Sequence, residues 1–256
     1  MKTMTEQRCP IHPYRHSLLL SALLVLSLAG NAEAKKGVYA ADPSNYELVE
    51  APTAYTLLHG GYDLNLRMYE GGGVILRGNV GFHRFLQFGF SGNATNLVGH
   101  GNIEIQEPRL AIKLKPLTQN RHTPVALALG WDDRGYGVSI DRRFTPGLQK
   151  GLYAVVSREF KQAGYLQVHG GANVVRPGSH YDRNRDLGAF GGVSFALSHA
   201  IFMTAEADKL LTDFWQINSG VQFNLGDSIR MGMDFRDINR SELFARILRI
   251  QYLGFF

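Results

Sequence analysis

The sequence predicts an all-β fold: a single closed antiparallel transmembrane β-barrel of about 12 strands, with both termini periplasmic. Three observations favour this fold class. Most of the chain alternates apolar and polar residues with a period of two. The first residues have the pattern of a secretory signal peptide. The last residues form an alternating segment that ends on an aromatic side chain, Phe256.

The N-terminal segment predicts export. Lys2, Arg8 and Arg15 precede an apolar run at 18–28, and an Ala-Glu-Ala sequence follows at 32–34. A basic start, an apolar core and an A-x-A exit together indicate a cleavable signal peptide. The apolar run is too short to cross a bilayer as a helix, which takes about 20 apolar residues.

These patterns divide the chain into three parts. The signal peptide is expected over 1–34 and contains the single cysteine, Cys9, so the mature chain would offer no disulfide and no cysteine metal ligand. Residues 35–59 lack clear periodicity and include two prolines, which predicts an extended periplasmic lead-in. The barrel is expected over 60–256, a length that suits one domain. The formal net charge of +5 is dispersed, so no nucleic-acid partner is expected.

From residue 61 onward, apolar residues recur at every second position, as in strands with one apolar and one polar face. At 62–68, for example, Leu64 and Leu66 alternate with Asn65 and Arg67. The facing of 152–160 is ambiguous. The twelve expected strands are 62–68, 76–82, 86–91, 109–114, 125–131, 152–160, 166–173, 187–197, 201–208, 215–224, 229–235 and 246–256.

Alternation alone does not separate a soluble barrel, with its apolar face inside, from a membrane barrel, with that face toward lipid. Here the apolar faces are nearly free of charge over about 7–10 residues, enough to cross a bilayer when tilted. Aromatic residues cluster where these faces end, with Tyr62 and Tyr252 at one level and Trp131 and Trp215 at the other. Short and long connections also alternate. We therefore expect an outer-membrane location, with membrane lipid and lipopolysaccharide as partners.

A membrane barrel must close, because hydrocarbon offers no water to the polar groups of an open sheet edge. We therefore expect 246–256 to pair with 61–69. The final strand also has the pattern of an insertion signal that the β-barrel assembly machinery recognises, although Gly254 stands where an apolar side chain is more typical. The residues assigned to this signal are Leu248, Ile250, Tyr252 and Phe256.

The polar faces predict a charged interior with more cations than anions. The candidate lumen-lining residues are Arg67, Arg77, Arg109, Lys113, Glu206 and Arg230. The other charges expected to point inward are Asp63, Lys115, Asp208, Asp234, Arg236 and Arg249. A cationic excess in a confined space would attract polysaccharide or small anionic solutes. Alternatively, opposite charges pair across strands and fill a purely structural barrel with no open pore.

No catalytic, cofactor or metal site is expected. An outer-membrane lipid-modifying hydrolase, the alternative class, needs a serine activated by a histidine, and no histidine of the mature chain is followed two residues later by serine. His169 is expected to point inward, but only Gln167 and Asn173 share its face. Around residues 132–143, arginines interleave with the aspartates, which favours surface ion pairs over a calcium site.

Three stretches carry a resemblance to a known family. They are LVEAPTAYTLLHGGYDLNLRMYEGGGV at 48–74, GNVGFHRFLQFGFSGNATNLVG at 78–99 and GLYAVVSREF at 151–160. Together they resemble the barrel region of YjbH-type outer-membrane proteins. The resemblance implies a role in exopolysaccharide production or export. The function expected is therefore that of a narrow passive conduit or surface scaffold in the outer membrane.

Overall fold

The computed structural model describes residues 45–99, 102–135, 150–160, 165–174, 187–209 and 215–256. The expected signal peptide at 1–34 and the first part of the expected lead-in, 35–44, lie outside these residues. Within the described ranges, no helix is long and apolar enough to cross a membrane.

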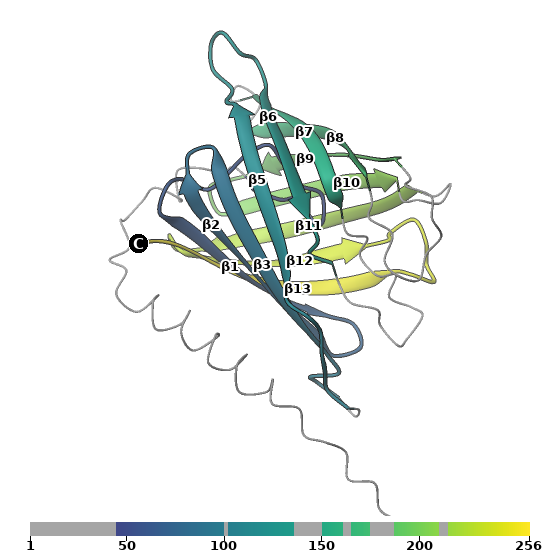
Figure 1. Ribbon diagram of the computed structural model, residues 1–256. Coiled ribbons are helices and arrows are strands. Elements are labelled where there is room, and N and C mark those ends of the chain that lie inside the picture. Colours follow the sequence, from purple (N-terminus) through teal and green to yellow (C-terminus); the bar gives the residue numbers. More distant parts are fainter. Residues whose placement is uncertain (1–44, 100–101, 136–149, 161–164, 175–186, 210–214) are drawn as a thin grey trace, which may run out of the picture.

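The described chain forms one antiparallel sheet that closes on itself (Figure 1). Its strands are β1 (Gly61–Tyr69), β2 (Gly73–His83), β3 (Leu86–Thr95), β4 (Glu104–Ile105), β5 (Arg109–Leu117), β6 (Ala126–Asp132), β7 (Gly151–Phe160), β8 (Leu166–Val174), β9 (Leu187–Ala196), β10 (Ile201–Lys209), β11 (Trp215–Leu225), β12 (Ile229–Arg236) and β13 (Ala245–Phe255). Of these 13 strands, β4 is a two-residue extension paired with the end of β3. The others form the ring, so the predicted closed 12-strand barrel is confirmed.

Closure occurs between the first and last strands, as expected. The β1–β13 register runs without interruption from Gly61 opposite Phe255 to Tyr69 opposite Ile247. All backbone groups along this seam therefore have ladder partners, which is the arrangement that hydrocarbon requires. The C-terminus consequently lies at the same rim as the start of β1, here called the terminal rim; the other end is called the opposite rim.

The two faces of the wall differ sharply in chemistry. Leu110 of β5 is 60% exposed and Leu187 of β9 is 76% exposed, although both side chains are purely apolar. Arg67 of β1 and Asp234 of β12 are 0% exposed. Apolar side chains outside and ionic side chains inside are the reverse of a soluble barrel, and they define this fold as a transmembrane β-barrel. Which rim faces the periplasm stays a prediction.

The structure resolves the ambiguous strand, β7. Tyr153, Val155 and Ser157 are buried and point inward, whereas Leu152 and Val156 are exposed. Apolar side chains occur on both faces because part of the interior beside β7 is itself apolar. That apolar filling comes from the segment immediately before the barrel.

The expected periplasmic lead-in is wrong for residues 45–57, because this segment lies inside the barrel. Glu47 and Pro52 form an antiparallel bridge, and the Leu48 N–H donates to the Ala51 carbonyl at 2.9 Å, so the segment doubles back on itself. We call residues 45–57 the inner hairpin and residues 47–51 its tip. Its second limb leads to Gly60 at the terminal rim, so the hairpin enters the barrel from that rim.

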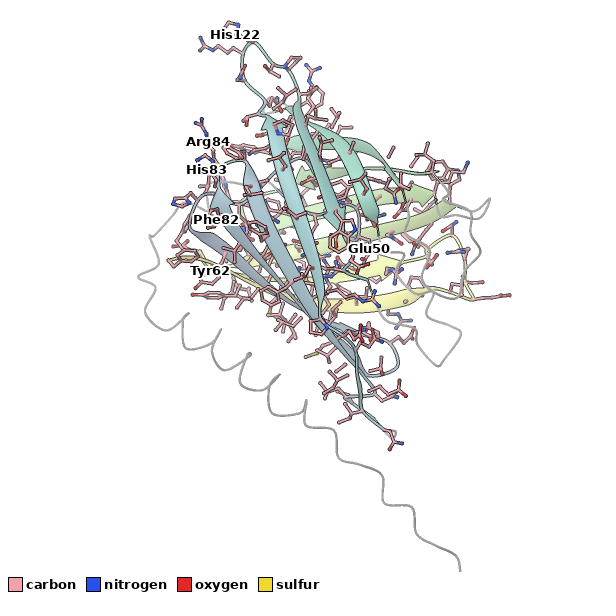
Figure 2. All side chains as sticks on the ribbon, viewed as in Figure 1. Glu50, Tyr62, Phe82, His83, Arg84 and His122 are labelled. Carbon is pink, nitrogen blue, oxygen red and sulfur yellow. The ribbon has the colours of Figure 1, made fainter. Side chains whose placement is uncertain are left out.

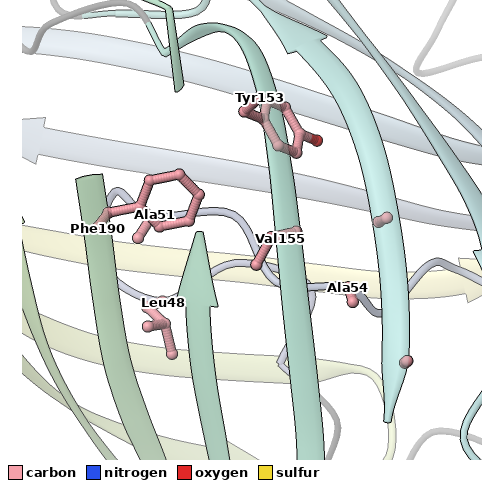
Figure 3. Close-up of a cluster of buried hydrophobic side chains, with 8 residues drawn as sticks. Leu48, Ala51, Ala54, Tyr153, Val155 and Phe190 are labelled. Carbon is pink, nitrogen blue, oxygen red and sulfur yellow. The ribbon is translucent and has the colours of Figure 1, made fainter. Parts of the chain in front are cut away.

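Apolar contacts hold one side of the inner hairpin. Leu48, Ala51 and Ala54 are completely buried in a single apolar cluster. On the wall side, the cluster contains Ala126, Ala128, Tyr153, Val155 and Phe190 (Figure 3). Small alanines on β6 leave the space that the hairpin occupies, so wall and hairpin are sterically matched.

Candidate lumen site

Two hairpin carboxylates meet two wall guanidinium groups at the tip. Glu50 contacts Arg67 of β1 at 3.2 Å and Arg77 of β2 at 3.1 Å. Glu47 lies 3.6 Å from Arg77 and also forms an ion pair with Arg67. Figure 2 shows Glu50 within the barrel, whereas Phe82 lies at the rim near the C-terminus. Each arginine therefore bridges both glutamates, an arrangement that suits the fork geometry of guanidinium.

These charges also control the ionisation of Glu47. Burial by itself would raise the pKa of Glu47, but the surrounding guanidinium groups, first those of Arg67 and Arg77, hold it well below the ordinary value of 4.5. The Glu47 carboxylate is therefore charged at neutral pH. Its attraction to the wall is electrostatic, and it acts across a water-poor interior where screening is weak.

The wall also binds the hairpin backbone through its carbonyls. Arg249 of β13 donates to the carbonyls of Leu48 and Val49, both at 3.2 Å. Lys113 of β5 donates to the carbonyls of Tyr46 at 2.8 Å and Tyr55 at 3.1 Å, so it ties the two limbs together. Two cationic side chains from separate strands, β5 and β13, thus hold the backbone of one short peptide.

One wall carboxylate binds the N–H groups of the hairpin backbone rather than its carbonyls. Glu206 of β10 accepts hydrogen bonds from three consecutive backbone N–H groups of the tip: Val49 at 3.1 Å, Glu50 at 2.9 Å and Ala51 at 2.9 Å. Asn218 of β11 donates to the same carboxylate at 2.7 Å. Charge-assisted bonds of this type are about twice as strong as neutral ones, so Glu206 is the main anchor of the tip backbone.

Neutral side chains hold the returning limb. The Ala54 N–H donates to Ser157 Oγ at 2.8 Å, and the Leu57 N–H donates to Gln87 Oε1 at 3.0 Å. Ser157 Oγ also lies 2.8 Å from His169 Nδ1 on the neighbouring strand β8. This serine–histidine contact links adjacent strands rather than residues two apart in sequence, so the sequence pattern missed it.

Not all interior charge involves the hairpin. Lys150, just before β7, forms a buried ion pair with Asp208 of β10. Arg249, which also donates to the hairpin backbone, pairs with Asp234 of β12 at 2.6 Å. These wall pairs match the expectation that opposite charges pair across strands. In the rest of the interior, the hairpin supplies the counter-charge, because Glu47 and Glu50 pair with wall arginines.

The inner hairpin occupies the lumen at its level. A cavity of about 10 Å³ beside the tip is lined by residues including Glu47, Glu50, Lys113 and Arg134. That volume holds about one water molecule.

Most candidate lumen residues lie where the sequence placed them. Arg67, Arg77, Lys113, Glu206 and Arg230 are buried on the inward face. All five bond to the hairpin; for Arg230 the bond goes to Asn45 Oδ1 at 3.1 Å. Arg109 differs, because it is only partly buried and donates to the Asp133 carbonyl at 3.4 Å near the start of β5.

Sequence reasoning missed Glu47 and Glu50, because the segment that carries them has no strand period. The available signal was two acidic residues directly before a barrel with excess inward cations. Arg134 was expected to form a surface ion pair, but its side chain is only 7% exposed and donates to Asn79 at 2.7 Å. The residues of the expected assembly signal face outward or lie at the rim: Leu248, Ile250, Tyr252 and Phe256.

The described ranges contain no group of three or more His, Cys, Asp or Glu side chains arranged to hold a metal. Asp132 forms an ion pair with Arg134 at 2.8 Å. Asp141, from the same aspartate-rich stretch, lies outside the described residues.

The chain matches no protein-family model and no curated protein sequence. Among solved structures it is similar to KdgM porin, with a TM-score of 0.48 and 12% identity over 75% of this chain and 98% of that chain. It is also similar to NanC porin, with a TM-score of 0.43 and 11% identity over 76% of this chain and 99% of that chain. Such distant similarity adds no argument about function, so the assignment as a transmembrane β-barrel rests on the strand pairing and the two faces. The resemblance to YjbH-type proteins stays a prediction.

Proposed function

We propose that this protein is a gated passive conduit of the outer membrane, closed at rest by its own inner hairpin. The observation that carries the proposal is the mode of attachment. The hairpin is held by ion pairs at its tip, by hydrogen bonds to the tip and to both limbs, and by two apolar clusters, and it enters from one rim without forming part of the sheet. It can therefore leave without breaking the barrel ladder.

The apolar outward belt of the wall supports an outer-membrane setting, because transmembrane β-barrels of this type belong to outer membranes. Membrane lipid and lipopolysaccharide would cover the belt, and the assembly machinery would insert the barrel by reading its last strand. A link with exopolysaccharide rests on the YjbH-type resemblance, part of which is the hairpin sequence itself. Loss of secreted polysaccharide after deletion of the gene would test that link.

Bilayer conductance tests the gate. Glu47→Gln/Glu50→Gln removes both tip charges while keeping side-chain size, and we expect open-state conductance events to become at least about tenfold more frequent, since each charged contact is worth about 1.5–3 kcal/mol. Glu70→Gln/Glu242→Gln is the matched control, because both carboxylates are exposed. Equal conductance in the two double variants would disprove the gate and favour a structural barrel or scaffold.

A hydrolase is the competing class, and the Ser157–His169 contact is the feature that would favour it. Both residues are buried in the lumen, and Ser157 Oγ already accepts the Ala54 N–H. A nucleophile at the lipid surface would need an exposed hydroxyl. We therefore infer a structural role for this pair. Release of fatty acid from phospholipid by the wild type but not by Ser157→Ala would overturn that inference.

A further inference from the structure

The hairpin tip behaves as a ligand in a preformed site. Its two carboxylates are bound by Arg67 and Arg77, which come from adjacent strands and are 0% and 3% exposed. Both arginines stand on strands whose ladder pairing does not involve the hairpin. Withdrawal of the hairpin would leave these guanidinium groups facing the lumen.

Two nearby wall carboxylates have cationic partners on the wall: Asp234 pairs with Arg249, and Asp132 pairs with Arg134. Glu206 would lose its three hairpin donors and keep its bond from Asn218. Without the two hairpin carboxylates, Arg67 and Arg77 would carry unbalanced positive charge in a confined lumen, so the emptied site would attract an anion from solution. The anion that fits must replace two carboxylates bridged by two guanidinium groups.

We propose that Arg67 and Arg77 form a polycarboxylate-binding site that the protein fills with its own Glu47 and Glu50, and that a soluble polycarboxylate competes for this site and displaces the hairpin. The displacement step rests on the proposed gate; the binding site does not. The ligand class is an organic molecule or chain carrying at least two neighbouring carboxylates, because each arginine contacts both glutamates.

Competition predicts that removing the internal ligand strengthens binding of an external one. Isothermal titration with citrate, at constant ionic strength, should give tighter binding to Glu47→Gln/Glu50→Gln than to wild type, by about tenfold or more. Adding Arg77→Gln to that variant should weaken citrate binding again by about tenfold. The control Glu70→Gln/Glu242→Gln should bind citrate as wild type does. A short poly-L-glutamate in place of citrate distinguishes a small acid from an acidic chain as the preferred ligand.

The outcomes separate the binding site from the gate. Tighter citrate binding with unchanged conductance would uphold the site and disprove the gate. Raised conductance without tighter citrate binding would uphold the gate and overturn the site. If the double variant fails to fold, the single variants Glu47→Gln and Glu50→Gln give the same comparison, each with a smaller expected gain in affinity.

Discussion

Two buried ionic groups inside this barrel are balanced in different ways. Lys150 is paired with Asp208, and both belong to the wall or its edge. Arg67 and Arg77 are paired with Glu47 and Glu50, which belong to the inner hairpin. The first pair does not include a hairpin residue, although the carboxylates of Glu206 and Glu50 also act on Lys150. The ion pairs of Arg67 and Arg77 depend on the inner hairpin, which lies outside the sheet. Buried ion pairs therefore stabilise the wall in one place and hold the hairpin in the other.

The largest effect is expected at the wall pair. Asp208→Asn removes the direct ion-pair partner of the buried Lys150 and should lower the free energy of unfolding in lipid by about 3 kcal/mol. Burial lowers the pKa of Lys150 to about 8, so the loss should shrink between pH 7 and pH 9 as the amine becomes neutral. Urea titration followed by tryptophan fluorescence measures both. A similar loss in Glu47→Gln/Glu50→Gln would erase the distinction between the two groups.

A smaller effect is expected from the tip anchor. Glu206→Ala removes the acceptor of three backbone N–H groups and should destabilise the closed hairpin by about 3 kcal/mol, with little change in barrel unfolding. Hydrogen exchange at Val49 and Ala51 would report it directly. Glu206→Gln, which keeps one acceptor oxygen, should show an intermediate increase in exchange. Unaltered exchange in the alanine variant would show that Glu206 is not the anchor.

Low pH should weaken the ion pairs between the inner hairpin and the wall arginines more than it weakens the Lys150–Asp208 pair. Because the pKa of Glu47 is lowered in the closed state, its contribution is complete above its ordinary pKa of 4.5 and is lost as the pH falls below that value. The loss is about 1.4 kcal/mol for each pH unit below 4.5, so openings in bilayers should become more frequent near pH 3.

The arginines facing Glu47 stay charged in this range, and Glu50 and Asp63 are the nearby carboxyl groups that could add to the acid response. Glu47→Gln is therefore the control and should have a flatter pH profile than wild type. Identical profiles would assign the acid response to another group.

The smallest effect is expected on the neutral limb. Ser157→Ala removes the acceptor of the Ala54 N–H and should cost about 1 kcal/mol, or roughly fivefold faster hydrogen exchange at Ala54. The half-buried Ser219 of β11 provides a matched control as Ser219→Ala. An effect as large as that of Glu206→Ala would mean that the limb, rather than the charged tip, holds the hairpin.

The sequence by itself determined the barrel. Alternation of side chains identifies both the strands and their faces, because a strand between lipid and a polar interior must place opposite chemistries on its two sides. Closure of the first strand on the last followed from the cost of an open edge in hydrocarbon. Arg67, Arg77, Lys113, Glu206 and Arg230 could be assigned to the interior on these grounds alone.

Only the tertiary structure decided what fills that interior. Residues 45–57 have no period that marks them as inside or outside, since they bind through backbone groups and two carboxylates rather than through one continuous face. The facing of β7 was hidden for the same reason, because Tyr153 and Val155 point inward against the hairpin instead of outward to lipid. Contacts between segments far apart in sequence carry no local signature, and the position of the hairpin inside the barrel depends on those contacts.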